Sequence, residues 1–337
     1  MVTAQVAARL VRARAAGQQA IALVGDASLV KWSLVGDRLQ PVASIIGEIP
    51  IAALSAPPDS ELFAAATLAG TVELRRWDDL SLAAAPLQAP AISSNGEVDS
   101  EITAIALSPD QKWLAIARED DDIYLCDSQR GELVATAEGS DWTSTLAFSP
   151  TDRQLAIACS FPGGSYARID ALQAGALEPV YDFVRSNNQT PAADFVDALA
   201  YLTFSPDARW LALFETATNH HDQHSPGWRG NLALYSLATG QLAWCAAVDA
   251  AATGDGRSLA QSGCHNGFYT ELSFLDAQTL ACGATAGKLL LYDVATGQLR
   301  RRLDLGRGAA VRSLASDSSG TLWLVLTDGE LLAIPPD

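Results

Sequence analysis

The chain is patterned as short apolar runs separated by tight polar turns. The runs Ile102–Leu107, Trp113–Ala117, Ile123–Cys126 and Leu133–Ala137 each have the length of a strand. Between the first two lies Ser108–Lys112, in which a proline sets φ and short polar side chains can bond to the backbone. This stretch therefore predicts a four-stranded antiparallel meander.

The same pattern recurs along the chain. A lone meander cannot bury both of its faces, so it must stack on others. The positions that end the first strand of each unit recur with a spacing of about 42 residues, lengthened by insertions in two intervals. These positions are Leu107, Phe148, Phe204, Phe274 and Ser316. A period of about 40–45 residues with four strands per unit predicts a β-propeller.

The repeated motifs also resemble the WD-repeat family. Ser205–Ala212 reads Ser-Pro-Asp-Ala-Arg-Trp-Leu-Ala, and Ala-Thr-Gly-Gln-Leu occurs at 238–242 and again at 295–299, each time after Leu-x-Leu-Tyr. The resemblance covers residues 18–335 and implies an all-β fold, a seven-bladed β-propeller of four-stranded antiparallel blades. We expect one domain over 1–337, with approximate blades at 9–47, 51–87, 102–137, 143–181, 198–248, 268–305 and 311–335.

The polar network that locks many blades of that family is largely lost here. The family uses a His, a Ser or Thr, an Asp and a Trp in each blade. The first unit keeps Asp26 and Trp32 but has Ala22 in the Ser position, and the sixth unit keeps only His265. The expected fold therefore depends on the periodicity and the turns.

Closure of the ring is predicted to involve the N-terminal segment. The seventh unit stops after its third strand, and Val2–Ala8 is the candidate for the fourth. Arg9–Arg14 would then form the first strand of the first unit. The alternative is an amphipathic helix over residues 2–15, because alanine and arginine both favour helix.

Composition and charge narrow the classes of function. The chain has 337 residues, of which 49% are hydrophobic, and it has no apolar run long enough to cross a bilayer. Five scattered cysteines without a CxxC pair favour a reducing compartment, so we expect a cytoplasmic protein; the arginine-rich start leaves an organellar transit peptide as the alternative. The net charge of −17 disfavours nucleic acid and anionic membranes and favours a partner with a basic surface.

Long insertions are predicted to gather on one face. The resemblance implies that the links between blades and the turns between second and third strands share a face, and the insertions 88–100, 182–197, 214–230 and 249–267 belong to these classes. We interpret this face as a binding surface, with neutral variation in surface loops as the alternative. Acidic residues map to it or its rim: Glu97, Asp99, Glu101, Glu119, Asp120, Asp121, Asp122, Asp141, Asp182, Asp194, Asp197 and Asp222.

Candidate partner-binding residues lie in these insertions. Aromatic side chains in exposed loops are typical interface anchors, and carboxylates steer a basic partner; burial beneath the loops is the alternative for the aromatic residues. The candidates are Phe183, Asp194, Phe195, Asp197, Asp222, Trp228 and Arg229.

The segment Asn219–His224 is the one stretch with metal-ligand chemistry. His220, His221, Asp222 and His224 are candidate ligands for zinc or another divalent ion. They lie almost consecutively in a long polar loop without cysteine, so we expect a solvated or partner-contacting loop and no structural metal site.

No catalytic or cofactor-binding motif is found. The sequence lacks GxSxG, HExxH and GxxxxGK[ST]. We therefore expect a non-catalytic protein–protein interaction scaffold, a subunit or adaptor of a multi-protein complex, and the Ala-rich, Lys-poor composition suggests a bacterial source. The alternatives are a propeller enzyme of the lactonase or hydrolase type and a sensor of small molecules or peptides.

Overall fold

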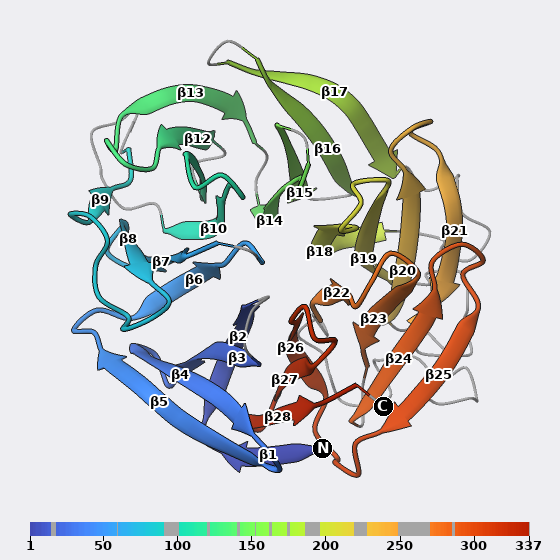
Figure 1. Ribbon diagram of the computed structural model, residues 1–337. Coiled ribbons are helices and arrows are strands. Elements are labelled where there is room, and N and C mark those ends of the chain that lie inside the picture. Colours follow the sequence, from blue (N-terminus) through green and yellow to red (C-terminus); the bar gives the residue numbers. More distant parts are fainter. Residues whose placement is uncertain are drawn as a thin grey trace.

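A computed structural model of the protein describes residues 1–14, 18–58, 60–90, 101–119, 122–139, 142–151, 153–161, 164–173, 176–185, 196–218, 228–248, 270–284 and 287–336. Within these residues the strands form seven four-stranded sheets, which are arranged around a ring (Figure 1). The predicted fold class, a seven-bladed β-propeller of antiparallel blades, is confirmed.

Each blade is a meander whose strands follow one another from the inside of the ring to the outside. Blades 1 to 4 consist of β2 (Ala8–Arg14), β3 (Gln19–Val24), β4 (Ser28–Val35) and β5 (Arg38–Ile46); β6 (Ile51–Ser55), β7 (Leu62–Thr67), β8 (Thr71–Arg76) and β9 (Leu87–Gln88); β10 (Ile102–Leu107), β11 (Trp113–Arg118), β12 (Asp122–Asp127) and β13 (Leu133–Glu138); and β14 (Trp142–Phe148), β15 (Gln154–Phe161), β16 (Gly164–Gln173) and β17 (Ala176–Arg185).

The remaining three blades complete the ring. They consist of β18 (Val196–Phe204), β19 (Trp210–Thr218), β20 (Trp228–Ser236) and β21 (Leu242–Ala247); β22 (Leu272–Phe274), β23 (Thr279–Gly283), β24 (Lys288–Asp293) and β25 (Leu299–Asp304); and β26 (Val311–Ser316), β27 (Leu322–Leu326), β28 (Glu330–Ile334) and β1 (Val2–Gln5).

The seventh blade joins the two ends of the chain. β1 pairs antiparallel with β28, with Ala4 opposite Leu331, and the Ala8 amide donates to the Gly329 carbonyl at 2.9 Å. Residues 2–14 thus form two strands, not the helix that was the alternative. The pairing covers the outer edge of β28 with a strand from the start of the sequence (Figure 1).

The core consists of apolar layers between neighbouring blades. Within the described residues the buried apolar side chains form seven clusters, and each cluster combines residues of two adjacent blades. Between blades 3 and 4, for example, Ile123 and Leu125 pack with Leu146 and Ile157. Full burial of such a side chain contributes about 1.5–3 kcal/mol, so stacking of the blades is what makes each meander stable.

Tight turns close one face of the ring. In blade 3 the Ser108 hydroxyl donates to Asp110 at 2.6 Å and accepts from the Trp113 amide at 2.9 Å. Blade 5 repeats this arrangement with Ser205, Asp207 and Trp210. We call this side the short-turn face and the opposite side the long-loop face.

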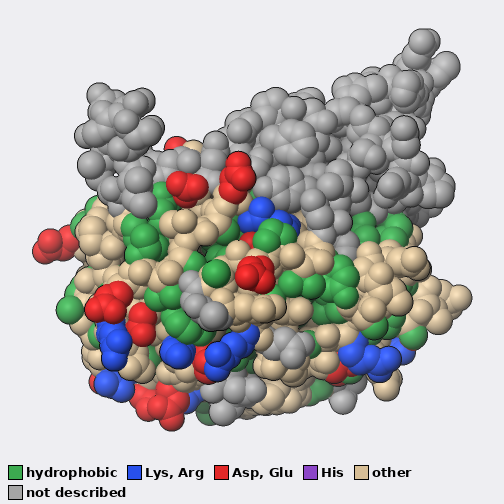
Figure 2. All heavy atoms as spheres, turned by 90° about the horizontal axis from the view of Figure 1, so that it is seen from above, with side chains coloured by type: hydrophobic (Ala, Val, Ile, Leu, Met, Phe, Trp, Pro, Cys, Tyr) green, Lys and Arg blue, Asp and Glu red, His purple; other side chains and the backbone are tan. Residues whose placement is uncertain are grey.

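The rim of the disc has a mixed surface. Figure 2 shows Asp and Glu side chains close to Lys and Arg side chains along the rim, with apolar side chains between them. Among the described residues, no helix has both the length and the apolarity required to cross a bilayer.

Candidate functional site

The inner wall of the ring is formed by the first strand of each blade. Six of these strands, within the described residues, carry a β-bulge at the equivalent position near the long-loop face. A bulge redirects a side chain and increases the local twist of the strand. The bulge residues are Arg9, Ala52, Thr103, Ser144, Ala200 and Arg312.

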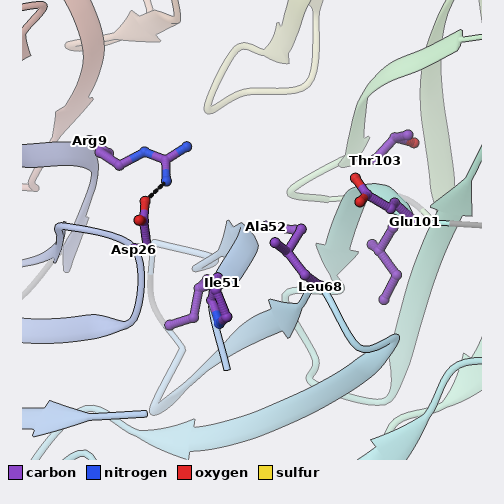
Figure 3. Close-up of a pocket in the computed structure, with 9 residues that line it drawn as sticks. Arg9, Asp26, Ile51, Ala52, Leu68, Glu101 and Thr103 are labelled. Atoms are coloured by element: carbon purple, nitrogen blue, oxygen red, sulfur yellow. Dashed lines mark hydrogen bonds and ion pairs between the residues drawn. The ribbon is translucent and has the colours of Figure 1, made fainter. Parts of the chain in front are cut away.

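A recess of about 510 Å³ lies beside three of these bulges on the long-loop face (Figure 3). Its lining, which we call the blade 1–3 recess, comprises Arg9, Asp26, Pro50, Ile51, Ala52, Leu68, Glu101, Ile102 and Thr103. Arg9 Nη1 donates to the Asp26 carboxylate on one wall, and Glu101 lies on the opposite wall (Figure 3). The recess therefore combines apolar walls with an ion pair and a further carboxylate.

A buried ion pair links blades deeper along the inner wall. Arg12 Nη2 lies 2.9 Å from Glu271 Oε1, and Arg12 Nε donates to the Leu54 carbonyl at 3.1 Å. The same Glu271 carboxylate accepts from the Ser313 hydroxyl and, at 3.2 Å, from the Leu314 amide. These contacts connect blades 1, 2, 6 and 7, and we call Arg12, Glu271 and Ser313 the inner polar cluster.

These side chains satisfy backbone groups that the sheets leave unpaired. The first strand of a blade is a sheet edge, so part of its amide groups have no partner within the sheet. The Val11 amide donates to the Ser313 hydroxyl at 3.1 Å, and the Leu107 amide donates to the Ser55 hydroxyl at 2.9 Å. In each case the acceptor belongs to the neighbouring blade, so the contact also joins two blades.

Two titratable groups of the inner wall, Arg12 and Tyr201, keep their protonation states around neutral pH. Burial opposes the charge of Arg12, but the negative charge of Glu271, the Tyr201 side chain and the hydrogen bond to Glu271 together outweigh it and raise the pKa of Arg12. Burial raises the pKa of Tyr201 far above its usual value, and the Glu271 charge raises it further. Neither Arg12 nor Tyr201 therefore exchanges a proton near neutral pH, as a general acid or base must.

A second arginine lies near the mouth of the inner wall. Arg312 has the bulge position in blade 7 that Arg9 has in blade 1. Burial lowers the pKa of Arg312, and the positive charge of Arg9 lowers it further. The two guanidinium groups thus lie close enough to repel each other, and Arg9 is paired with Asp26.

Metal-ligand chemistry is not found in the described part of the chain. No group of three or more His, Cys, Asp and Glu side chains there could hold a metal ion. The candidate ligands His220, His221, Asp222 and His224 lie outside the described residues. Of the five cysteines, four lie in the described residues, and none of these four is in a disulfide: Cys126, Cys159, Cys245 and Cys282.

The predicted partner-binding residues are placed only in part. Asp194, Phe195 and Asp222 lie outside the described residues. For the others the backbone alone is described. Phe183 lies in β17 opposite Ala167, Asp197 lies at a bulge of β18, and Trp228 and Arg229 begin β20. These positions are at strand ends that face the long-loop side of blades 4 and 5.

Several residues of the inner wall were not anticipated from the sequence. Arg9 and Arg12 lie in β2, Arg312 lies in β26 and Glu271 comes directly before β22, so each places a charge in or beside a first strand that also has apolar residues. That interruption of the apolar pattern was the available signal, because a charge on an inner strand needs a partner on another blade.

Comparison with known proteins identifies a family for part of the chain. Residues 54–149 match the model described as the anaphase-promoting complex subunit 4 WD40 domain. The match runs from β6 to the end of β14 and so includes blades 2 and 3. A search of curated proteins finds no match. Together, this match and the ring of seven four-stranded blades show that the chain is a WD40-repeat β-propeller.

Proposed function

We propose that the protein is a non-catalytic interaction scaffold that binds other proteins through its long-loop face, as a subunit or adaptor of a bacterial multi-protein complex. WD40 propellers are commonly protein-interaction scaffolds. The observation that carries the proposal is the difference in connection length between the two faces of the ring.

The difference is largest in blades 4 to 6. On the short-turn face, β18 and β19 are joined by Ser205–Arg209 alone. On the long-loop face the chain runs from Arg185 to Val196, from Thr218 to Trp228 and from Ala247 to Leu272 between consecutive strands. Long connections on a rigid scaffold carry an entropic cost and are common sites of binding.

The matched family supports membership in a complex. The family model is named after a subunit of a protein complex. The inner wall also supports a scaffold in preference to the hydrolase alternative, because Glu271, Arg12 and Ser313 bond to one another and to backbone groups. Groups engaged in this way hold blades together and leave little freedom for proton transfer.

The chemistry of the partner follows from charge. A chain of net charge −17 repels nucleic acid and anionic membranes and attracts a protein with a basic surface. Five scattered cysteines without a CxxC pair support a reducing compartment such as the cytoplasm.

Affinity capture from the native host tests this proposal. The tagged chain is cross-linked in cells, purified and analysed by mass spectrometry, and we expect a stoichiometric protein partner with a basic contact surface. Trp228→Ala is then expected to weaken binding by roughly 2 kcal/mol or more if it is an anchor. Charge reversal of Asp194 and Asp197 is expected to slow association and to reduce its dependence on salt.

Asp37→Asn on the short-turn face is the control and is expected to bind normally. Cross-links confined to the outer strands or to the short-turn face, with normal binding by the Trp228, Asp194 and Asp197 variants, would contradict the proposal.

A further inference from the structure

The blade 1–3 recess has the features of a site for one basic side chain. It is one of the hollows on the long-loop face, and three blades contribute to its lining. Its volume of about 510 Å³ falls within the range of roughly 300–1,000 Å³ that is typical of ligand sites. We propose that this recess receives a lysine or arginine side chain of the partner protein, an inference that rests on the proposed scaffold function and specifies its partner.

The charge balance of the recess favours a cation. Arg9 and Asp26 neutralise each other on one wall. Glu101 on the opposite wall is exposed, and within the described residues its carboxylate has no hydrogen bond or ion pair. Figure 3 shows this carboxylate turned toward the space between it and the Arg9–Asp26 pair. The lining as a whole therefore carries one carboxylate without a counter-charge.

The position of Glu101 is fixed by the backbone. Its carbonyl accepts from the Glu119 amide at 3.1 Å, and β10 begins at the next residue. Thr103, two residues further along β10, has a buried hydroxyl without a hydrogen-bond partner among the described residues. An incoming ammonium or guanidinium group would supply the donors that the Glu101 carboxylate lacks, at a site held in place by the sheet.

The apolar walls fit the stem of a long basic side chain. Leu68 is 43% exposed although it is a large apolar residue, and Ile51 and Ala52 line the floor between the two charged walls. Lysine and arginine place their methylene groups along such apolar surface while the charge stays at a polar site. A short acidic side chain would cover little of this surface and would meet Glu101 with like charge.

Four small probes test the inference by ligand-observed NMR titration of the full-length protein. N-acetyl-arginine methylamide and N-acetyl-lysine methylamide carry the proposed charge. N-acetyl-norleucine methylamide has the apolar stem alone, and N-acetyl-glutamate methylamide has the opposite charge. We expect the arginine or the lysine probe to bind at least fivefold more tightly than the norleucine probe, and this preference to weaken as salt rises.

Variants then locate the binding. Glu101→Gln is expected to reduce the affinity for the basic probe to that of the norleucine probe, whereas Asp37→Asn, which removes one carboxylate from the short-turn face, leaves it unchanged. Leu68→Ala is expected to weaken the basic and the norleucine probes alike, since both use the apolar wall. A melting curve for each variant confirms that it is folded.

Three results would overturn the inference: equal binding of the basic and norleucine probes, tighter binding of the glutamate probe through Arg9 and Arg312, or an undiminished preference for the basic probe in Glu101→Gln. If a partner is captured from the host and binds Glu101→Gln normally, the recess assignment fails while the scaffold proposal stands. If the probes bind as expected but no partner is captured, the scaffold proposal fails.

Discussion

Two parts of the ring hold their blades together in different ways. Between blades 3 and 4 the contact is mainly apolar, with Ile123, Leu125, Leu146 and Ile157 buried against one another, and at the surface Arg168 Nη2 donates to the Glu138 carbonyl at 2.8 Å. Around blades 6, 7, 1 and 2 the apolar layers are supplemented by the inner polar cluster, in which Arg12 reaches both Glu271 and the Leu54 carbonyl.

The two kinds of contact differ mainly in how strictly they fix the relative orientation of neighbouring blades, and less in how much they stabilise the ring. Apolar contact is favourable in many relative orientations, because it depends on the area removed from water. The bonds of Glu271 to Arg12, Ser313 and the Leu314 amide require defined distances and angles. The bonds of the inner polar cluster lie around the place where the first and the last blades meet, and there the ring has to close in one register.

Removal of residues 1–8 is the strongest way to disturb this closure. The variant lacks the pairing of β1 with β28, which contributes several hydrogen bonds of roughly 1 kcal/mol each, and it exposes a sheet edge. We expect the free energy of unfolding to fall by about 5 kcal/mol in chemical denaturation. Replacement of Val2–Gln5 by a glycine–serine segment of equal length removes the β1 side chains and keeps the length of the chain, so it separates the effect of strand pairing from that of deletion. If either variant melts at the temperature of the native protein, residues 1–8 have no role in closing the ring.

Arg12→Met is expected to have the next largest effect. It leaves the Glu271 carboxylate, whose side chain is 11% exposed, without its counter-charge. Loss of one member of a buried ion pair costs about 3 kcal/mol or more. The double variant Arg12→Met/Glu271→Gln removes the stranded charge and keeps an acceptor for the Leu314 amide, so we expect it to be more stable than Arg12→Met. If the double variant is less stable than Arg12→Met, the unpaired charge of Glu271 is not the cause of the lost stability.

Ile157→Val is the matched change in the apolar contact of blades 3 and 4. It removes one methylene from a fully buried side chain and is expected to cost about 1 kcal/mol. Combined with Arg12→Met, the two losses should add to within about 0.5 kcal/mol, because the sites share no partner. A clear departure from additivity would show that the two parts of the ring are coupled.

Ala22→Ser is expected to give the smallest effect, and of opposite sign. Trp32 Nε1 is buried without a hydrogen-bond partner among the described residues, and Ala22 occupies the place where the WD-repeat pattern has a serine. A hydroxyl within reach of Trp32 would add up to about 1 kcal/mol of stability. Ala156→Ser, which buries a hydroxyl in blade 4, is the control and is expected to destabilise. Equal losses in both variants would contradict the pairing with Trp32.

The blade pattern was predictable because it is local. Turns such as Ser108–Lys112 and the repeated Ala-Thr-Gly-Gln-Leu mark strand ends within a few residues, and their spacing gives the number of units. The structure bears out the number of blades and the four-stranded sheets. A strand within Val2–Ala8 was also predicted to complete the last unit, because that unit stops after its third strand, and in the structure Val2–Gln5 pairs with β28.

The inner wall was not predictable, because its contacts join distant parts of the chain. Arg12 and Glu271 meet only after every blade is in place, and nothing near either residue in the sequence indicates the other. The recess depends on bulges at Arg9, Ala52 and Thr103, and a one-residue shift of register leaves no clear mark on the apolar pattern. The predictions for Phe183, Asp194, Phe195, Asp197, Asp222, Trp228 and Arg229 as a partner-binding surface stay predictions.

The pairing of β1 with β28 has a consequence for synthesis in the cell. β1 leaves the ribosome before the other strands of the ring, and its partner strand β28 leaves after them. At about 10 residues per second, β1 waits roughly half a minute before β28 emerges. During that interval six blades can stack, but the first of them has no seventh neighbour. Folding of this ring during synthesis therefore depends on residues 2–5 staying free of other pairing until β28 has emerged.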